Sequence, residues 1–84
     1  MRHAREAALD TIEDLLVKIR KYQSLTERKR GAFYKKSAGF VHFHEDPAGM
    51  FGDLKVCGEW QRFRVTTRVE QKRFLAMLSS ALDP

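Results

Sequence analysis

Residues 40–57 read FVHFHEDPAGMFGDLKVC, and this stretch decides the fold. Apolar and polar side chains alternate on both sides of the segment Asp46-Pro47-Ala48-Gly49-Met50, whose Pro and Gly favour a turn. The alternation predicts two strands, 40–45 and 51–57. Because a short turn joins them, they are expected to pair antiparallel.

The same period of two continues on both sides of this hairpin. It predicts further strands at 32–36 and 60–66. Ser37-Ala38-Gly39 is expected to be a three-residue loop with Gly39 in the left-handed conformation, and Gly58-Glu59 a two-residue hairpin turn. The four strands would form a meander.

Two segments have helical periodicity. In residues 4–22 apolar side chains recur at spacings of three and four, which predicts one amphipathic helix. A second helix is expected at 68–82, where Thr67 and Glu70 form a capping box. Residues 24–31 break the pattern and are expected to be a basic connection.

The chain has 84 residues, of which 43% are hydrophobic and 32% charged, and this composition favours one soluble domain spanning residues 1–84. The expected fold is α+β, in the order α-β-β-β-β-α. It is a two-layer sandwich in which the N-terminal and C-terminal helices cover one face of a four-stranded antiparallel meander. The other face is left to solvent, a ligand or another subunit.

Strand alternation assigns the side chains to the two faces. The helix-covered face is apolar and is expected to hold Phe33, Val41, Phe43, Leu54, Val56, Phe63 and Val65. The helix-free face mixes aromatic, basic and titratable side chains: Tyr34, Lys36, Phe40, His42, His44, Asp53, Lys55, Cys57, Trp60, Arg62 and Arg64. This second set is too polar for a core and too aromatic for an ordinary surface.

The turn lengths suggest a register for these strands. They place Tyr34 opposite His42, and Lys36 opposite Phe40. The Gly58-Glu59 turn pairs Cys57 with Trp60, Lys55 with Arg62, and Asp53 with Arg64. Asp53 would lie beside either His42 or His44, so that a row Tyr34–His42–Asp53–Arg64 crosses the sheet.

His42-Phe43-His44 places two imidazoles on one face of a strand, about 6–7 Å apart. They are candidates for a shared zinc ion, with Asp53 or Cys57 as a further ligand. The spacing fixes no third ligand, and Lys55, Arg62 and Arg64 would repel a cation. Histidines that only form hydrogen bonds are the simpler interpretation, so no metal or other cofactor is assigned.

An enzyme is the third interpretation of the same face. A histidine beside Asp53 has the chemistry of an acid–base group, and Cys57 that of a nucleophile. An open sheet face, however, does not enclose a substrate. The sequence therefore assigns no catalytic residue, and Cys57 is expected to be a passive thiol.

Charge and aromatic content point to an anionic ligand. The net charge is +5, and residues 18–36 hold eight Lys and Arg and only one acid. On the helix-free face aromatic and basic side chains alternate, as in proteins that stack bases and hold phosphates. The candidate ligand-binding residues are Tyr34, Lys36, His42, His44, Asp53, Lys55, Trp60, Arg62 and Arg64. A basic surface that only aids solubility is the simpler alternative.

Residues 31–45, GAFYKKSAGFVHFHE, together with Gly52–Val56 and Arg62–Thr67, resemble a group of small bacterial single-domain proteins of unknown function. The shared pattern is F-Y-x-K-S-x-x-F-x-H-F-H-E. The resemblance implies a bacterial cytosolic protein and transfers no catalytic residue.

The leading functional hypothesis is a small cytoplasmic binding module for an anionic ligand: nucleic acid, a nucleotide or an acidic protein. The alternative is a homodimer that buries the sheet face, because interfaces are also enriched in aromatic residues and Arg. A single cysteine suits a reducing cytoplasm. No segment has the apolar length of a membrane span or a signal peptide, so no membrane partner is expected.

Overall fold

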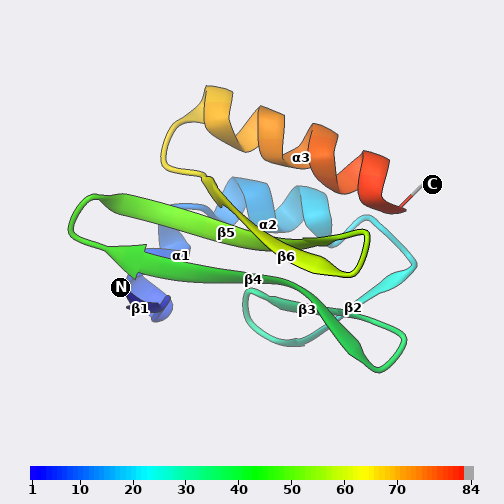
Figure 1. Cartoon of the computed structure of the whole chain (residues 1–84). Coiled ribbons are helices and arrows are strands. Elements are labelled where there is room, and N and C mark those ends of the chain that lie inside the picture. Colours follow the sequence, from blue (N-terminus) through cyan, green and yellow to red (C-terminus); the bar gives the residue numbers. More distant parts are fainter. Residues whose placement is uncertain (83–84) are drawn as a thin grey trace.

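The computed structural model describes residues 1–82 and is an α+β fold built on one antiparallel sheet. Three helices lie on one face of the sheet and leave the other uncovered (Figure 1). The order along the chain is β1 (Arg2–His3), α1 (Glu6–Asp10), α2 (Glu13–Ile19), β2 (Leu25–Lys29), β3 (Ala32–Lys35), β4 (Ala38–Asp46), β5 (Gly49–Val56), β6 (Glu59–Arg64) and α3 (Arg68–Leu82). The predicted α+β class and antiparallel sheet are confirmed, but within residues 1–82 the sheet has six strands instead of four, and there are three helices instead of two.

The two additional strands lie on the same side of β4 as β3. The sheet order is β2-β3-β4-β5-β6, and β1 pairs with β4 through Arg2↔Glu45 and His3↔His44. The basic connection expected at residues 24–31 is therefore wrong, because most of it forms β2. Its polar residues pair along the outer edge of β3, where a charged strand is tolerated.

The predicted helix over residues 4–22 is two short helices separated at Thr11 and Ile12. The Thr11 hydroxyl donates to the carbonyl of Ala8 at 2.6 Å, and the backbone N–H groups of Thr11 and Ile12 form i→i−3 bonds. Ile12 then leaves the helical conformation, with φ −121° and ψ 22°. Leu9, Ile12 and Leu16 are nevertheless all buried, so the break preserves the apolar face.

The predicted C-terminal helix, α3, begins where the sequence indicated, directly after Thr67. The backbone N–H of Glu70 donates to the Thr67 hydroxyl at 3.2 Å, and the Glu70 carboxylate accepts the backbone N–H of Thr67 at 2.9 Å. This reciprocal pair is a capping box. The buried side chains of α3, Phe74 and Leu78, pack in the core.

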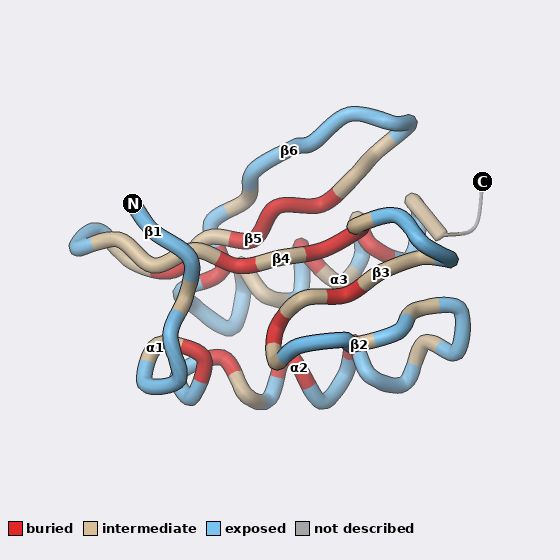
Figure 2. Tube along the Cα trace, turned by 90° about the horizontal axis from the view of Figure 1, so that it is seen from below, coloured by how far each residue is buried: buried red, intermediate tan, exposed pale blue. Residues whose placement is uncertain are grey.

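The face assignment is confirmed for the apolar set. Five of its members are buried in one cluster with the helices, and Val56 and Phe63 pack against that cluster. Figure 2 shows the buried stretches running along β4 and β5, whereas most of β6 is exposed. The five buried members are Phe33, Val41, Phe43, Leu54 and Val65.

Phe40 is the one aromatic residue assigned to the wrong face. Phe33 pairs with Val41 but the next residue, Tyr34, pairs with Gly39, so Phe40 is an extra residue in a β-bulge. The bulge turns its side chain into the core, where Phe40 is only 7% exposed. Simple alternation cannot anticipate this change of face.

The turns differ from the predicted ones, and the register shifts with them. Lys35 pairs with Ala38, so Lys36 rather than Gly39 takes the left-handed conformation, with φ 58°. Val56 pairs with Glu59 around Cys57 and Gly58, both of which have positive φ. Two consecutive left-handed residues characterise the hairpin turn whose twist matches that of the strands.

The observed pairs therefore replace several predicted ones. Lys55 lies opposite Trp60, Asp53 opposite Arg62, and Phe51 opposite Arg64. Tyr34 lies opposite Gly39 instead of His42. Of the two positions left open for Asp53, the structure has the one opposite His42. Lys36 and Cys57 are turn residues and have no strand partner in these hairpins.

None of the helices within residues 1–82 combines the length and the apolar character that a membrane span needs.

Candidate functional site

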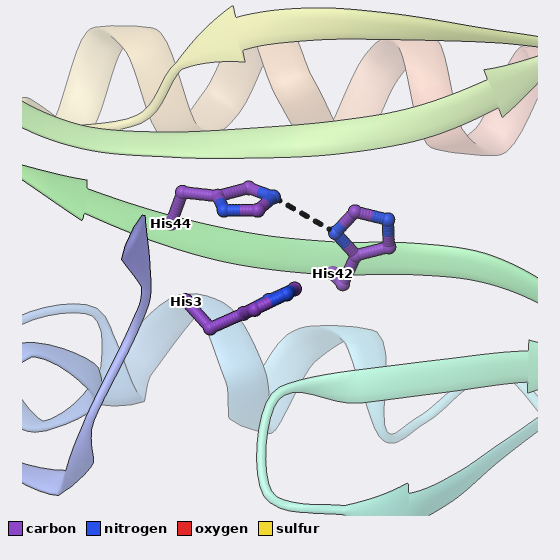
Figure 3. A group of neighbouring side chains, drawn as sticks. All are labelled: His3, His42 and His44. Carbon is purple, nitrogen blue, oxygen red and sulfur yellow. Dashed lines mark hydrogen bonds between the residues drawn. The ribbon is translucent and has the colours of Figure 1, made fainter. Parts of the chain in front are cut away.

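The helix-free face holds a cluster of three histidines. His42 and His44 come from β4, and His3 reaches them from β1 (Figure 3). One ring nitrogen of each histidine lies within 4.8 Å of the others. His42 Nδ1 is 3.1 Å from His44 Nε2. We call His3, His42 and His44 the histidine cluster.

Asp53 lies beside the histidine cluster on the neighbouring strand β5. Its carboxylate Oδ2 is 3.1 Å from His44 Nε2 and 3.8 Å from His42 Nδ1. Arg62, on β6, donates two hydrogen bonds to the same carboxylate. Asp53 is only 6% exposed although it lies on the helix-free face, because these side chains cover it.

These contacts set the ionisation of the buried groups. Burial alone would raise the pKa of Asp53, but the hydrogen bonds and positive charge of Arg62 outweigh it, so the pKa lies below its ordinary value. Burial lowers the pKa of His42, and the attraction of Asp53 only partly opposes this effect. At neutral pH the site therefore holds an ionised Asp53 and a neutral His42.

His3 is the member of the cluster that sequence reasoning missed. It lies outside the predicted strands, and its position depends on the pairing of β1 with β4. Glu45 fixes this pairing: its carboxylate accepts hydrogen bonds from the Arg2 side chain at 3.0 and 3.2 Å, and from the backbone N–H of Arg5 at 2.8 Å. The sequence offered one signal for including His3: the chain has three histidines, and the other two were already candidate site residues.

Aromatic side chains lie next to the histidine cluster, beside His42. The Trp60 ring lies 4.5 Å from the His42 ring, measured between centroids. Trp60 also borders Gly39, as does Tyr34: a Cβ atom placed at Gly39 would be 3.7 Å from Trp60 Cζ2 and 3.9 Å from Tyr34 Cε2. We call Tyr34, Gly39 and Trp60 the aromatic platform.

Three cations of this face lie over aromatic rings. Arg28 is 4.7 Å from the centroid of Tyr34, Lys55 is 5.0 Å from Trp60, and Arg64 is 5.8 Å from Phe51. Cation–π contacts of this kind hold a charge close to an aromatic surface. Arg28 and Phe51 were not among the predicted ligand-binding residues.

Several basic residues are already paired with acids. Arg62 is bound to Asp53, and Arg64 forms an ion pair with Glu70 at 3.3 Å. In the basic segment 18–36, Arg20 pairs with Glu13 and Glu27. Arg30 contacts three carboxylates of the first two helices: Glu6, Asp10 and Glu13. The basic charge available to a ligand is therefore smaller than the composition suggests.

The predicted site residues separate into two groups. His42, His44, Asp53, Lys55, Trp60 and Arg62 lie together with His3, and Tyr34 joins them across Gly39. Arg64 lies further along β6 beside Phe51, whereas Lys36 and Cys57 are exposed turn residues. The chain matches no protein-family model, no curated protein and no solved structure.

Proposed function

We propose that the protein is a small binding module whose helix-free sheet face takes an anionic ligand, with single-stranded nucleic acid as the leading class. The aromatic platform is the observation that carries this proposal. Gly39 has no side chain, and the rings of Tyr34 and Trp60 border it on two sides. Trp60 is 45% exposed although it is the largest side chain in the protein. Exposed rings on a sheet provide stacking surfaces for unpaired bases.

Positive charge lies directly beside these rings. Arg28 and Lys55 contact Tyr34 and Trp60, and neither has a carboxylate at ion-pair distance among residues 1–82. A nucleotide stacked on the platform would have its phosphate within reach of one of these cations. Stacking together with phosphate contacts is the usual mode of binding without strong sequence preference.

The pairing of the other cations refines the expected contacts. Arg62 holds Asp53 with two hydrogen bonds, so its charge is largely used within the protein. Lys55 and Arg28 are the better candidates for phosphate contacts. Lys36, exposed in the turn next to the platform, is a third.

Titration with short oligodeoxythymidine and oligouridine tests the proposal. Trp60 is the only tryptophan, so its fluorescence reports directly on the platform. We expect quenching on binding and an affinity that falls with salt, by about 0.7 units of log K per phosphate contact per unit of log salt concentration. Trp60→Ala has no tryptophan, so its binding is followed by the anisotropy of a labelled oligonucleotide, and it should cost about 1–3 kcal/mol of binding free energy.

Lys55→Ala should reduce the salt slope, whereas the matched single variant Lys72→Ala, at an exposed position of α3, should change it little. Equal losses from both variants would contradict a site on the sheet face. A doubled mass that persists at high salt would favour the homodimer instead. If acidic peptides bind and oligonucleotides do not, the ligand class is an acidic protein and not nucleic acid.

The proposed setting is the cytoplasm, where single-stranded nucleic acid and nucleotides occur. The single cysteine, Cys57, is exposed and unpaired, which suits a reducing compartment.

A further inference from the structure

We propose that the histidine cluster binds one divalent transition-metal ion, of which zinc is the test case, through the imidazoles of His3, His42 and His44. The inference does not depend on nucleic-acid binding. It rests on three imidazoles from two strands that converge on one point of the helix-free face (Figure 3).

The separations of the donor atoms suit a metal site. In a tetrahedral zinc site with Zn–N distances near 2.0–2.1 Å, two donor atoms are about 3.3 Å apart. His42 Nδ1 and His44 Nε2 are 3.1 Å apart. The ligand nitrogen of His3 lies within 4.8 Å of the other two. His3 is exposed, so its side chain is less restricted by packing than those of His42 and His44.

The protons of the cluster provide a second argument. His44 Nε2 lies 3.1 Å from His42 Nδ1 and also 3.1 Å from the Asp53 carboxylate. This nitrogen carries at most one proton, and that proton cannot be directed fully at both neighbours. A metal ion at the centre would instead accept the lone pairs of both imidazoles. It would also be attracted by the carboxylate.

The Asp53 carboxylate adds an electrostatic contribution to the site. It is nearly buried, and its Oδ2 lies 3.1 Å from His44 Nε2. Because it contacts the proposed ligand nitrogen itself, it would lie beside a bound cation and attract it. Its two hydrogen bonds from Arg62 hold it in this position.

The third ligand is held in place by the fold. Beyond the bonds that Glu45 makes to Arg2 and Arg5, the backbone N–H of Ala4 donates to the carbonyl of Phe43 at 3.1 Å. These bonds place His3 directly opposite His44 in the β1–β4 ladder. His3 and His42 also line a cavity of about 240 Å³ between β1 and β3, so a fourth ligand from solvent has access.

The donor set predicts which metals bind. Imidazole nitrogen suits Zn²⁺, Cu²⁺, Ni²⁺ and Co²⁺, whereas Mg²⁺ and Ca²⁺ prefer oxygen ligands. We therefore expect zinc binding to persist in a large excess of Mg²⁺. Three histidines with one open position should also give Co²⁺ the absorption spectrum of a tetrahedral complex.

The experiment is a zinc titration of metal-free protein that carries no histidine tag, followed by calorimetry and by a chromophoric chelator. We expect one zinc per chain. His3→Ala, His42→Ala and His44→Ala each remove a ligand and should each weaken binding more than Asp53→Asn, which keeps all three imidazoles and removes only the neighbouring negative charge. The matched control Lys72→Ala lies at an exposed position of α3, on the other face of the sheet, and should bind zinc like the unchanged protein.

Thermal unfolding with and without zinc gives a second readout. A ligand that binds only the folded state raises the melting temperature, so zinc should stabilise the protein but not its His3→Ala variant. His3 is exposed, so this variant should fold normally, which circular dichroism checks. Unchanged zinc affinity in His3→Ala would overturn the three-histidine site, as would the absence of stoichiometric zinc binding. Because the titration contains no nucleic acid, failure here is distinguishable from failure of the oligonucleotide test.

Discussion

The guanidinium of Arg62 donates two hydrogen bonds to the carboxylate of Asp53, at 2.8 Å from Nε and 2.9 Å from Nη2. The Asp53 side chain is 9% exposed and that of Arg62 is 49% exposed. This pair joins β5 to β6 on the face that also holds the histidine cluster. Arg62 therefore stabilises the site from within and is a poor candidate for direct ligand contact.

Arg62→Ala should accordingly destabilise the fold. It leaves a nearly buried carboxylate without its main partner, and we expect a loss of about 1–2 kcal/mol in unfolding free energy. This is less than the ~3–5 kcal/mol for a fully buried pair, because solvent screens the half-exposed guanidinium. Urea denaturation measures it. Arg64→Ala, which removes a more exposed pair with Glu70, is the control and should cost less.

Phe43 and His42 are neighbours on opposite faces of β4, and their alanine variants should differ strongly. Phe43 is 3% exposed and packs against Phe74, so Phe43→Ala should cost about 3–5 kcal/mol. His42→Ala should cost less than about 1 kcal/mol in metal-free protein. Similar unfolding midpoints for the two variants would contradict the assignment of faces. If Phe43→Ala does not fold, Phe43→Leu gives the same comparison at a smaller loss.

Gly52→Ala should destabilise the contact between the sheet and α3. A Cβ atom at Gly52 would lie 2.8 Å from Phe74 Cε1 and 3.0 Å from Phe43 Cε1. Both rings are buried, so neither can move freely, and we expect a loss of about 1–3 kcal/mol. Gly39→Ala is a matched control, because its Cβ would make only ordinary contacts, at 3.7 Å or more. A melting temperature unchanged by Gly52→Ala would show that α3 can shift away from the sheet.

Thr67→Ala should remove the N-cap of α3 and cost about 1 kcal/mol. The hydroxyl accepts the backbone N–H of Glu70, which is left without that partner in the variant. Thr67→Ser retains the hydroxyl and should retain most of the stability. The comparison of both unfolding midpoints separates the cap from any effect of the lost methyl group.

Glu27 should contribute to acid unfolding. Burial alone would raise its pKa, but hydrogen bonds from Arg20 and from the backbone N–H of Gly31 outweigh it, so the pKa is lowered in the folded state. The resulting stability is complete above the unfolded pKa of about 4.3 and is lost as the pH falls through the lower folded value. Glu27→Gln should therefore flatten the pH dependence of unfolding below about pH 4.3. The matched control is Glu59→Gln, at the exposed first position of β6, where the carboxylate has no ion pair among residues 1–82.

The parts of the fold that could be predicted are those encoded by local periodicity. Alternation placed Phe43 and His42 on opposite faces, and the Thr67–Glu70 pair marked the start of α3. The break at Ile12 left no signal, because the apolar face continues across it. The strand β2 was missed because its sequence, LTERK, is polar on an edge where alternation matters little.

The site was only partly predictable for a related reason. His42 and His44 are two residues apart, so their common face follows from the strand alone. The addition of His3 requires a pairing between the first strand and β4, which local patterns cannot reveal. The β6 neighbour of Asp53 depended on a turn in which Cys57, rather than Gly58, begins the left-handed backbone, and the neighbour of Tyr34 on one in which Lys36 takes that conformation.

The pairing of β1 with β4 also has a consequence for the order of folding. Arg2 and Glu45 are 43 residues apart, whereas β4, β5 and β6 are joined by tight turns. Closing a long loop costs more entropy than closing a short one, so the hairpins should form first and β1 should dock last. During synthesis His3 leaves the ribosome early but has no strand to pair with until residues 44–45 have emerged. The metal-binding position would thus be completed only when the sheet is already in place, and zinc should slow unfolding more than it accelerates folding.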